Sequence, residues 1–163
     1  MTNEVRIILI TAVLIIISAC SGGGATNNSS SGAENATVAG IDANNDGVRD
    51  DVQRYIYATY PNSAKSRSAL TQYAKGVQAS FVNVSTARQA VVVEPQLLRA
   101  GACVTATMGS TSAITEIDAR MANTPARVNA RSTYEGYLEG KVFTIPAGDP
   151  ATLCDVNPAS LPN

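Results

Sequence analysis

The stretch from residue 64 to residue 82, AKSRSALTQYAKGVQASFV, decides the fold class. Apolar side chains recur in it at intervals of three or four residues, which is the spacing that places them along one face of a helix. That face comprises Leu70, Tyr73, Ala74, Val77 and Phe81. Because a helix with such a face must bury it against other elements, the segment predicts a helical core.

Segments with the same periodicity flank this one. We expect further helices over residues 48–59, 86–108, 113–123 and 124–140. Thr124 followed by Pro125 is a helix start signal, because Thr caps free N–H groups and Pro fits the first helical position. Pro95 should kink or split the helix that contains it, and residues 91–93, three valines, are a short strand in the alternative interpretation. The fold class is therefore all-α, a small bundle of four or five helices.

The C-terminal part, from Lys141 onward, has too many prolines and glycines for long regular structure. We expect an irregular tail whose VFTIP sequence, residues 142–146, lies extended against the bundle through Phe143 and Ile145.

Composition excludes several classes of function. The chain has 163 residues, a formal charge of −1 and no His. It therefore has no Ser-His-Asp triad and no His zinc site. The nearly balanced charge argues against a dedicated nucleic-acid binder, so we expect no nucleic-acid partner.

Charge is uneven along the chain. Between Val52 and Thr115 there are six basic residues and one acidic residue, Glu94. This region is either a face for an acidic partner, such as lipid headgroups, an anionic glycan or a protein, or ordinary solvated helix surface.

The first twenty residues have the features of a targeting segment. Residues 7–17 carry no charge but are too few to cross a bilayer, which needs roughly 20 residues, and they fit the apolar region of a signal peptide. They end in Ile17-Ser18-Ala19-Cys20, which resembles the bacterial lipobox. The resemblance implies a signal peptide over residues 1–19 and a Cys20 that carries diacylglycerol and an N-linked acyl chain such as palmitate. With Ser21 next, it also implies an outer-membrane lipoprotein that faces the periplasm. A plain secretory signal or an anchor helix is the alternative.

Residues 20–40 follow as a linker rich in Gly, Ser and Asn. Because the linker has few apolar residues to bury, we expect a flexible tether that joins the lipidated Cys20 to one helical domain over residues 41–163.

The domain begins with the loop IDANNDGVRDDV, residues 41–52. Its D-x-N-x-D-G pattern puts oxygen side chains at alternate positions around a glycine turn at Gly47, which suits a hard cation. The loop resembles the calcium loops of EF-hands, dockerin modules and thrombospondin type 3 repeats. The resemblance implies one structural Ca²⁺ with these ligand positions: Asp42, Asn44, Asp46, the Val48 carbonyl, Asp50 and Gln53.

Position 12 of the loop departs from the pattern. It is normally an acidic residue, but here it is Gln53, so the site is weaker or is completed by Asp51 or water. Among the neighbouring residues only Arg49 offsets the aspartates. The alternative interpretation is an Asp/Asn-Gly turn that merely caps the next helix.

The cysteines divide into a lipidated residue and a pair. If Cys20 is lipidated, Cys103 and Cys154 remain, and in an oxidising compartment we expect them to form a disulfide. The alternative, a reactive Cys103, has no His to activate it.

These observations predict a membrane-anchored envelope lipoprotein that is a non-enzymatic binding or assembly module. Its partner would be an envelope protein or an anionic glycan. One alternative is a purely structural lipoprotein. The other is a hydrolase of envelope polymers, since glycosidases need only two carboxylates, here drawn from Glu94, Glu116, Glu135 and Glu139.

Overall fold

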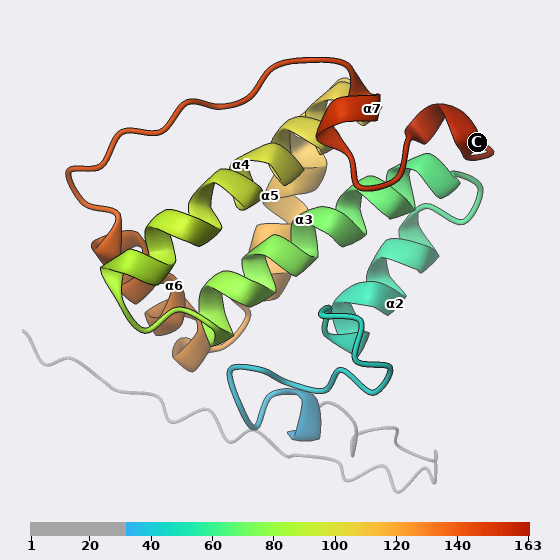
Figure 1. The fold of residues 1–163 in the computed structure, drawn as a ribbon. Helices are drawn as coiled ribbons and strands as arrows, with labels where there is room; N and C mark the ends of the chain where they lie inside the picture. The colour runs from blue at the N-terminus through green and yellow to red at the C-terminus, as the bar shows by residue number, and fades with distance from the viewer. Residues whose placement is uncertain (1–31) are drawn as a thin grey trace, which may run out of the picture.

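The computed structural model describes residues 32–163, and the elements in this range are all helical. They are α2 (Asp50–Thr59), α3 (Ala64–Val82), α4 (Ala87–Met108), α5 (Ser112–Met121), α6 (Pro125–Tyr137), the short α7 (Pro150–Leu153) and the 3₁₀ turn η1 (Pro158–Ser160) (Figure 1). The predicted all-α bundle is confirmed. The predicted signal peptide, Cys20 and most of the predicted linker lie outside the described residues.

Helix α3 is the centre of the bundle. It packs against α2, α4, α5, α6 and η1, and Figure 1 shows it between α4 on one side and α2 on the other. Its apolar residues join one buried cluster with side chains from α2, α4, α5 and α7, among them Val52, Ile56, Val104 and Ile117. The periodic segment that predicted a helical core therefore forms the element that the other helices cover.

The helix ends follow local side-chain chemistry. The hydroxyls of Ser63, Thr86 and Thr124 each accept a hydrogen bond from a backbone N–H in the first turn of α3, α4 and α6. Gly109 ends α4 in the left-handed conformation (φ 68°), which glycine adopts without steric cost.

Helix α4 runs through Pro95 without a break. Residues 91–93 are helical, so the alternative of a short strand is wrong. The flanking turns supply enough helical hydrogen bonds to tolerate the one that Pro95 cannot make.

The packed domain begins before residue 41. Val38 packs against the core, and the backbone oxygens of Glu34, Thr37 and Val38 accept hydrogen bonds from Arg127 in α6. We expected residues 20–40 to be a flexible tether. From Glu34 onward this segment is bound to the bundle instead.

The tail leaves α6 and returns along α4 to α7 (Figure 1). The prediction that Ile145 anchors it is wrong, because this side chain is 68% exposed and the nearby Val142 is 95% exposed. Phe143 is only partly buried. Residues 142–148 form no backbone hydrogen bond with the rest of the described chain, so this part of the tail is attached at its two ends.

Within residues 32–163, no helix combines the length and the apolar character that crossing a bilayer requires.

Candidate functional site

The predicted calcium loop is tightly folded around Asp42. Its two carboxylate oxygens accept the N–H groups of Asp46 (3.1 Å) and Gly47 (2.8 Å). Asn45 and Gly47 both have positive φ, 54° and 88°, so the backbone turns twice within three residues. Asn and Gly are the residues that adopt this conformation most readily, which explains why they occur here.

The other loop side chains are also hydrogen-bonded within the loop. Asp46 accepts from the Val48 N–H (2.9 Å) and from the Asn44 amide (2.9 Å), and Asp50 accepts from the Ala43 N–H (3.1 Å). In the described part of the chain, no three acidic, Cys or His side chains come together as a group that could bind a metal ion. The oxygens of the predicted ligands therefore all belong to one loop. Their carboxylates accept hydrogen bonds from N–H groups of that loop and do not form a group that could bind a metal ion.

Two further observations bear on whether the loop fits a cation. Val48 is fully buried, and its carbonyl oxygen accepts no hydrogen bond from the described residues, so it is a buried acceptor without a protein donor. Helix α2 begins at Asp50 without a side-chain cap, but the Asp50 N–H donates to the Ile41 carbonyl (2.8 Å), so the loop caps this helix through its backbone. The donor chemistry, hard oxygens at alternate positions, fits Ca²⁺.

Gln53 and Asp51 have different roles near the loop. Gln53 lies in the first turn of α2, and its N–H bonds to the Arg49 carbonyl. Both carboxylate oxygens of Asp51 bind the Arg49 guanidinium, at 2.7 and 2.8 Å. Burial acts to raise the pKa of Asp51, but the hydrogen bonds and charge of Arg49 outweigh it and leave this pKa below its usual value. Asp51 is thus engaged by Arg49 and is not available as the missing calcium ligand.

A pair of buried arginines lies beside the loop, and sequence reasoning missed it. Arg49 and Arg127 are both fully buried. Arg49 also donates to the carbonyl oxygens of Met121 (3.2 Å) and Arg120 (3.0 Å) at the end of α5. Arg127 binds no carboxylate among residues 32–163. It donates to the backbone oxygens of residues 34, 37 and 38 and to the side chains of Asn35 and Asn123.

This arginine pair explains how the N-terminal segment is attached. At Gly40 (φ 68°), a Cβ would lie 2.5 Å from the Arg49 side chain and 2.8 Å from that of Arg127, so only glycine fits. Burial and the charge of Arg49 both lower the pKa of Arg127. No local sequence signal distinguishes these two arginines from surface ones.

Lys75 of α3 is a second cation that lies next to the loop. Its aliphatic stem packs on Gly47, where a Cβ would lie 3.2 Å from the Lys75 Cγ. Its ammonium makes no ion pair within 4 Å with the described residues. The sequence suggested that Arg49 is the only cation near the aspartates, but Lys75 lies near them as well.

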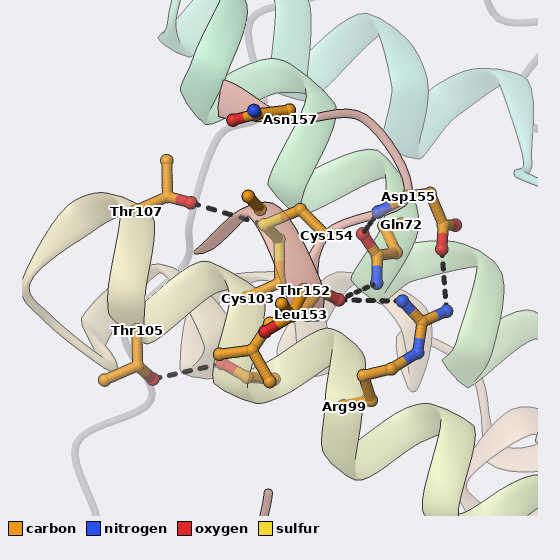
Figure 2. Close-up of a disulfide and its surroundings, with 12 residues drawn as sticks. Gln72, Arg99, Cys103, Thr105, Thr107, Thr152, Leu153, Cys154, Asp155 and Asn157 are labelled. Carbon is orange, nitrogen blue, oxygen red and sulfur yellow. Dashed lines mark hydrogen bonds and ion pairs between the residues drawn. A yellow bond between two sulfur atoms is a disulfide. The ribbon is translucent and has the colours of Figure 1, made fainter. Parts of the chain in front are cut away.

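The predicted disulfide between Cys103 and Cys154 is present and joins α4 to the end of α7, with Cα atoms 5.1 Å apart. Figure 2 shows that Arg99 and Gln72 both point at the Leu153 carbonyl, which accepts from them at 2.8 and 3.1 Å. Gln72 also accepts from the Asp155 N–H (2.8 Å). The covalent bond and these hydrogen bonds together attach α7 to α3 and α4.

Next to the disulfide lies a cavity of about 680 Å³ that the sequence did not predict. Helix α4 forms one wall with small and aliphatic residues, and the tail forms another. The lining comprises Tyr73, Glu94, Leu97, Leu98, Gly101, Ala102, Thr105, Ala106, Thr111, Ile114, Ile145, Pro146, Ala147, Gly148 and Leu153. Since the Thr105 hydroxyl donates to the Gly101 carbonyl (3.1 Å), its polarity is satisfied within the helix.

The cavity adjoins a smaller, polar hollow of about 170 Å³, because Tyr73, Glu94 and Leu97 line both. Two phenols donate to carboxylates there: Tyr134 to Glu94 (2.7 Å) and Tyr73 to Asp118 (2.8 Å). Burial, reinforced by these carboxylates, raises the pKa of both tyrosines, so they stay protonated donors.

The four carboxylates predicted for the hydrolase alternative do not all lie at one site. Glu94 and Glu135 line the small hollow, where Glu94 accepts from Tyr134 and Glu135 pairs with Arg131 at 2.8 Å. Glu116 and Glu139 are exposed and line neither space.

Half of the six basic residues expected to face an acidic partner are engaged within the domain. Arg54 pairs with Glu34, Arg99 with Asp155, and Arg67 donates to the Tyr60 and Pro61 carbonyls. These contacts favour the interpretation of this region as helix surface.

Comparison with protein-family models, with curated proteins and with solved structures finds no match to this chain.

Proposed function

We propose that this chain is a lipid-anchored bacterial envelope protein whose helical domain is a non-enzymatic binding module for a small apolar ligand. The observation that carries the proposal is the cavity of about 680 Å³ between α4 and the tail. Ligand sites are typically concave, about 300–1,000 Å³ in volume, and mainly apolar with a few polar groups. This cavity has all three properties. It favours a small apolar ligand over the anionic glycan that the sequence suggested.

The binding site is tested by filling it. Gly101 faces the cavity, and a Cβ there would meet Tyr73 at 3.7 Å, so Ala fits while the larger side chain of Gly101→Leu projects into the space. The probe is N-phenyl-1-naphthylamine, an apolar dye that fluoresces when it leaves water. We expect saturable binding by the full chain and a loss of at least about tenfold in affinity in Gly101→Leu, which corresponds to roughly 1.4 kcal/mol.

Gly136→Leu is the matched control, because Gly136 lies in α6 with open space around it. This variant should bind the dye as the wild type does. Absence of saturable dye binding by the wild type, or equal affinity of Gly101→Leu, would show that the cavity is not a binding site.

The lipid anchor rests on the lipobox-like sequence that ends in Cys20. An anchor with several acyl chains binds a membrane stably, whereas one chain binds marginally. In a bacterial host, we expect the chain to incorporate labelled palmitate and to fractionate with the outer membrane. Cys20→Ala should abolish both. Labelling that persists in this variant would contradict the anchor.

We also propose that the loop at residues 42–53 binds one Ca²⁺ with a structural role. The proposal is supported by the spacing of Asp42, Asn44, Asp46 and Asp50 and by the buried Val48 carbonyl without a donor. Since Asp51 is engaged by Arg49, Gln53 or water completes the ligand set. Ca²⁺ would replace the N–H groups that these carboxylates now accept from. Three carboxylates predict a dissociation constant of about 0.1–1 mM.

Thermal unfolding with 5 mM Ca²⁺ and then with a chelator tests this role. At about ten times the dissociation constant, binding to the folded state raises stability by roughly 1.4 kcal/mol, so the melting temperature rises by a few degrees. Asp46→Ala should remove the rise, and Glu139→Ala, on the exposed C-terminal side of α6, should keep it. An identical melting temperature in Ca²⁺ and in chelator would exclude the metal.

A further inference from the structure

The cavity has one charged side chain in its lining, Glu94. Its position in α4 is one turn before Leu97 and Leu98, so the carboxylate lies at one end of an aliphatic wall. Its Oε2 accepts from the Tyr134 hydroxyl at 2.7 Å. Its Oε1 accepts no hydrogen bond from the described residues, so one carboxylate oxygen is available to a ligand.

The charges around Glu94 are mainly negative. The adjoining hollow is lined by the carboxylates of Glu94, Asp118 and Glu135 and by one guanidinium, that of Arg131. Arg131 is paired with Glu135 at 2.8 Å. Among the described residues, the hydrogen-bond donors to Glu94 and Asp118 are neutral phenols, although the charge of Arg131 also acts on Asp118. This end of the cavity would attract a cation and repel an anion.

The rest of the wall offers no further charge and little free polarity. The α4 wall includes the small residues Gly101, Ala102 and Ala106, and the tail contributes Pro146 and Gly148 to the lining. Such a surface suits an unbranched hydrocarbon chain, which gains affinity from burial of its methylene groups.

From this juxtaposition we propose that the cavity binds a single-chain amphiphile with a cationic ammonium head group, with the head at Glu94 and the chain along α4. The inference rests on the proposed binding function and specifies its ligand class. The ammonium donates to the Glu94 oxygen that has no protein donor. A fatty acid would place its carboxylate beside those of Glu94 and Asp118 and is disfavoured.

Displacement of N-phenyl-1-naphthylamine from the full chain by three amphiphiles with the same number of carbon atoms tests the proposal. They are dodecylammonium, dodecanol and dodecanoate, used below their micelle concentrations. We expect dodecylammonium to bind at least about tenfold more tightly than dodecanoate, with dodecanol between them, because attraction for one ion and repulsion of the other add. Equal affinities, or a preference for dodecanoate, would overturn the proposal.

Glu94→Gln keeps the shape of the side chain and removes its charge. The readout is the ratio of dodecylammonium affinity to dodecanol affinity within each variant, which cancels small changes in the cavity. The ratio should fall several-fold in Glu94→Gln and should stay at the wild-type value in Glu116→Gln, an exposed residue of α5 outside both spaces. An unchanged ratio in Glu94→Gln would refute the role of Glu94.

If Glu94→Gln does not fold, Tyr134→Phe replaces it in the test. Loss of the phenol O–H leaves both Glu94 oxygens to the ligand, so the same ratio should rise, and a constant or lower ratio counts against the proposal.

The proposed binding function and the proposed ligand class fail on different results. Without any dye binding, the binding function is wrong. With dye binding that Gly101→Leu blocks but no head-group preference, only the ligand class is wrong.

Discussion

The arginine pair and the cavity lie in the same small bundle but are stabilised in opposite ways. Around Arg49 and Arg127, side-chain donors meet carbonyl, amide and carboxylate oxygens, and both guanidinium groups are fully buried. At the cavity, a tail segment without backbone hydrogen bonds borders about 680 Å³ of open space, and a disulfide attaches the tail beyond it.

This difference distinguishes a structural region from the proposed binding region. A buried network whose donors are used up has nothing left to offer a ligand and is costly to disturb. Where a covalent bond attaches a segment, the segment does not need to pack closely, so space stays open. The exposed Ile145 and Val142 show how little apolar area the tail itself buries.

The disulfide is the strongest single constraint on the cavity side. Replacing Cys103 and Cys154 with Ala frees a loop with a sequence separation of 51 residues. In the chain-entropy model this lowers the free energy of unfolding by about 4 kcal/mol. Urea denaturation of wild type and double variant measures the change. Dye binding should fall with it, since the tail is released at one end. A loss below about 1 kcal/mol would mean that packing alone retains the tail.

Arg127→Met tests the other region. It leaves the backbone oxygens of residues 34, 37 and 38 without their donor, and buried acceptors that lose a charged donor are expensive. We expect a loss of about 3 kcal/mol in the free energy of unfolding and faster proteolysis before residue 41. Arg131→Met is the control, because this side chain in the same helix is 44% exposed and pairs with Glu135, and it should change stability by less than about 1 kcal/mol. Equal losses of unfolding free energy in the two variants would show that the buried arginine network is no more important for stability than an exposed ion pair.

The pH dependence of stability reports the Asp51–Arg49 pair. Because the folded-state pKa of Asp51 is lowered, the pair stabilises the domain above the unfolded-state pKa, about 3.9, and this stabilisation is lost as the pH falls through the folded-state value. At pH 7, Asp51→Asn should lower the free energy of unfolding by about 1–2 kcal/mol. The variant should also lose less stability than the wild type between pH 5 and pH 2. Parallel curves of stability against pH for the two proteins would argue against the pair.

The smallest effect compares two glycines on the α3–α4 seam. At Gly76 a Cβ would lie 3.0 Å from Leu97 Cδ1 and 3.4 Å from its Cα, whereas at Gly101 the nearest atom is 3.7 Å away. Gly101→Ala should stabilise the domain by about 0.5–1 kcal/mol, because alanine loses less backbone entropy in a helix. At Gly76 the close contact should cancel or reverse this gain. Melting temperatures of the two variants decide the order, and a larger gain at Gly76 would show that the seam is not tighter there.

Much of the fold could be predicted, because its signals are local. The predicted boundaries of the 64–82 helix agree with those of α3, since Ser63 supplies the cap and the apolar face repeats every three or four residues. Local patterns failed where the outcome depends on distant atoms. Ile145 was expected to be buried by its apolar character, but the bundle offers this part of the tail no closely packed surface.

The candidate site was predictable only in part. The spacing of Asp42, Asn44, Asp46 and Asp50 is visible in the sequence, but the engagement of Asp51 by Arg49 and the approach of Lys75 to Gly47 are not. The cavity was not predicted at all, because α4 supplies only one wall, and the residues from α3, α5 and the tail that complete it are distant in sequence.

Sequence alone determined the helix periods, the helix start at Thr124-Pro125 and the cysteine pair, because these depend on residues within a few positions or on a simple count. Tertiary structure decided which arginines are buried, since the segment that binds Arg127 lies 89 to 93 positions earlier in the chain. It also decided that Glu94 borders an open cavity while Glu116 faces solvent. The physical reason is that burial and charge pairing are properties of surfaces that meet only after the helices pack.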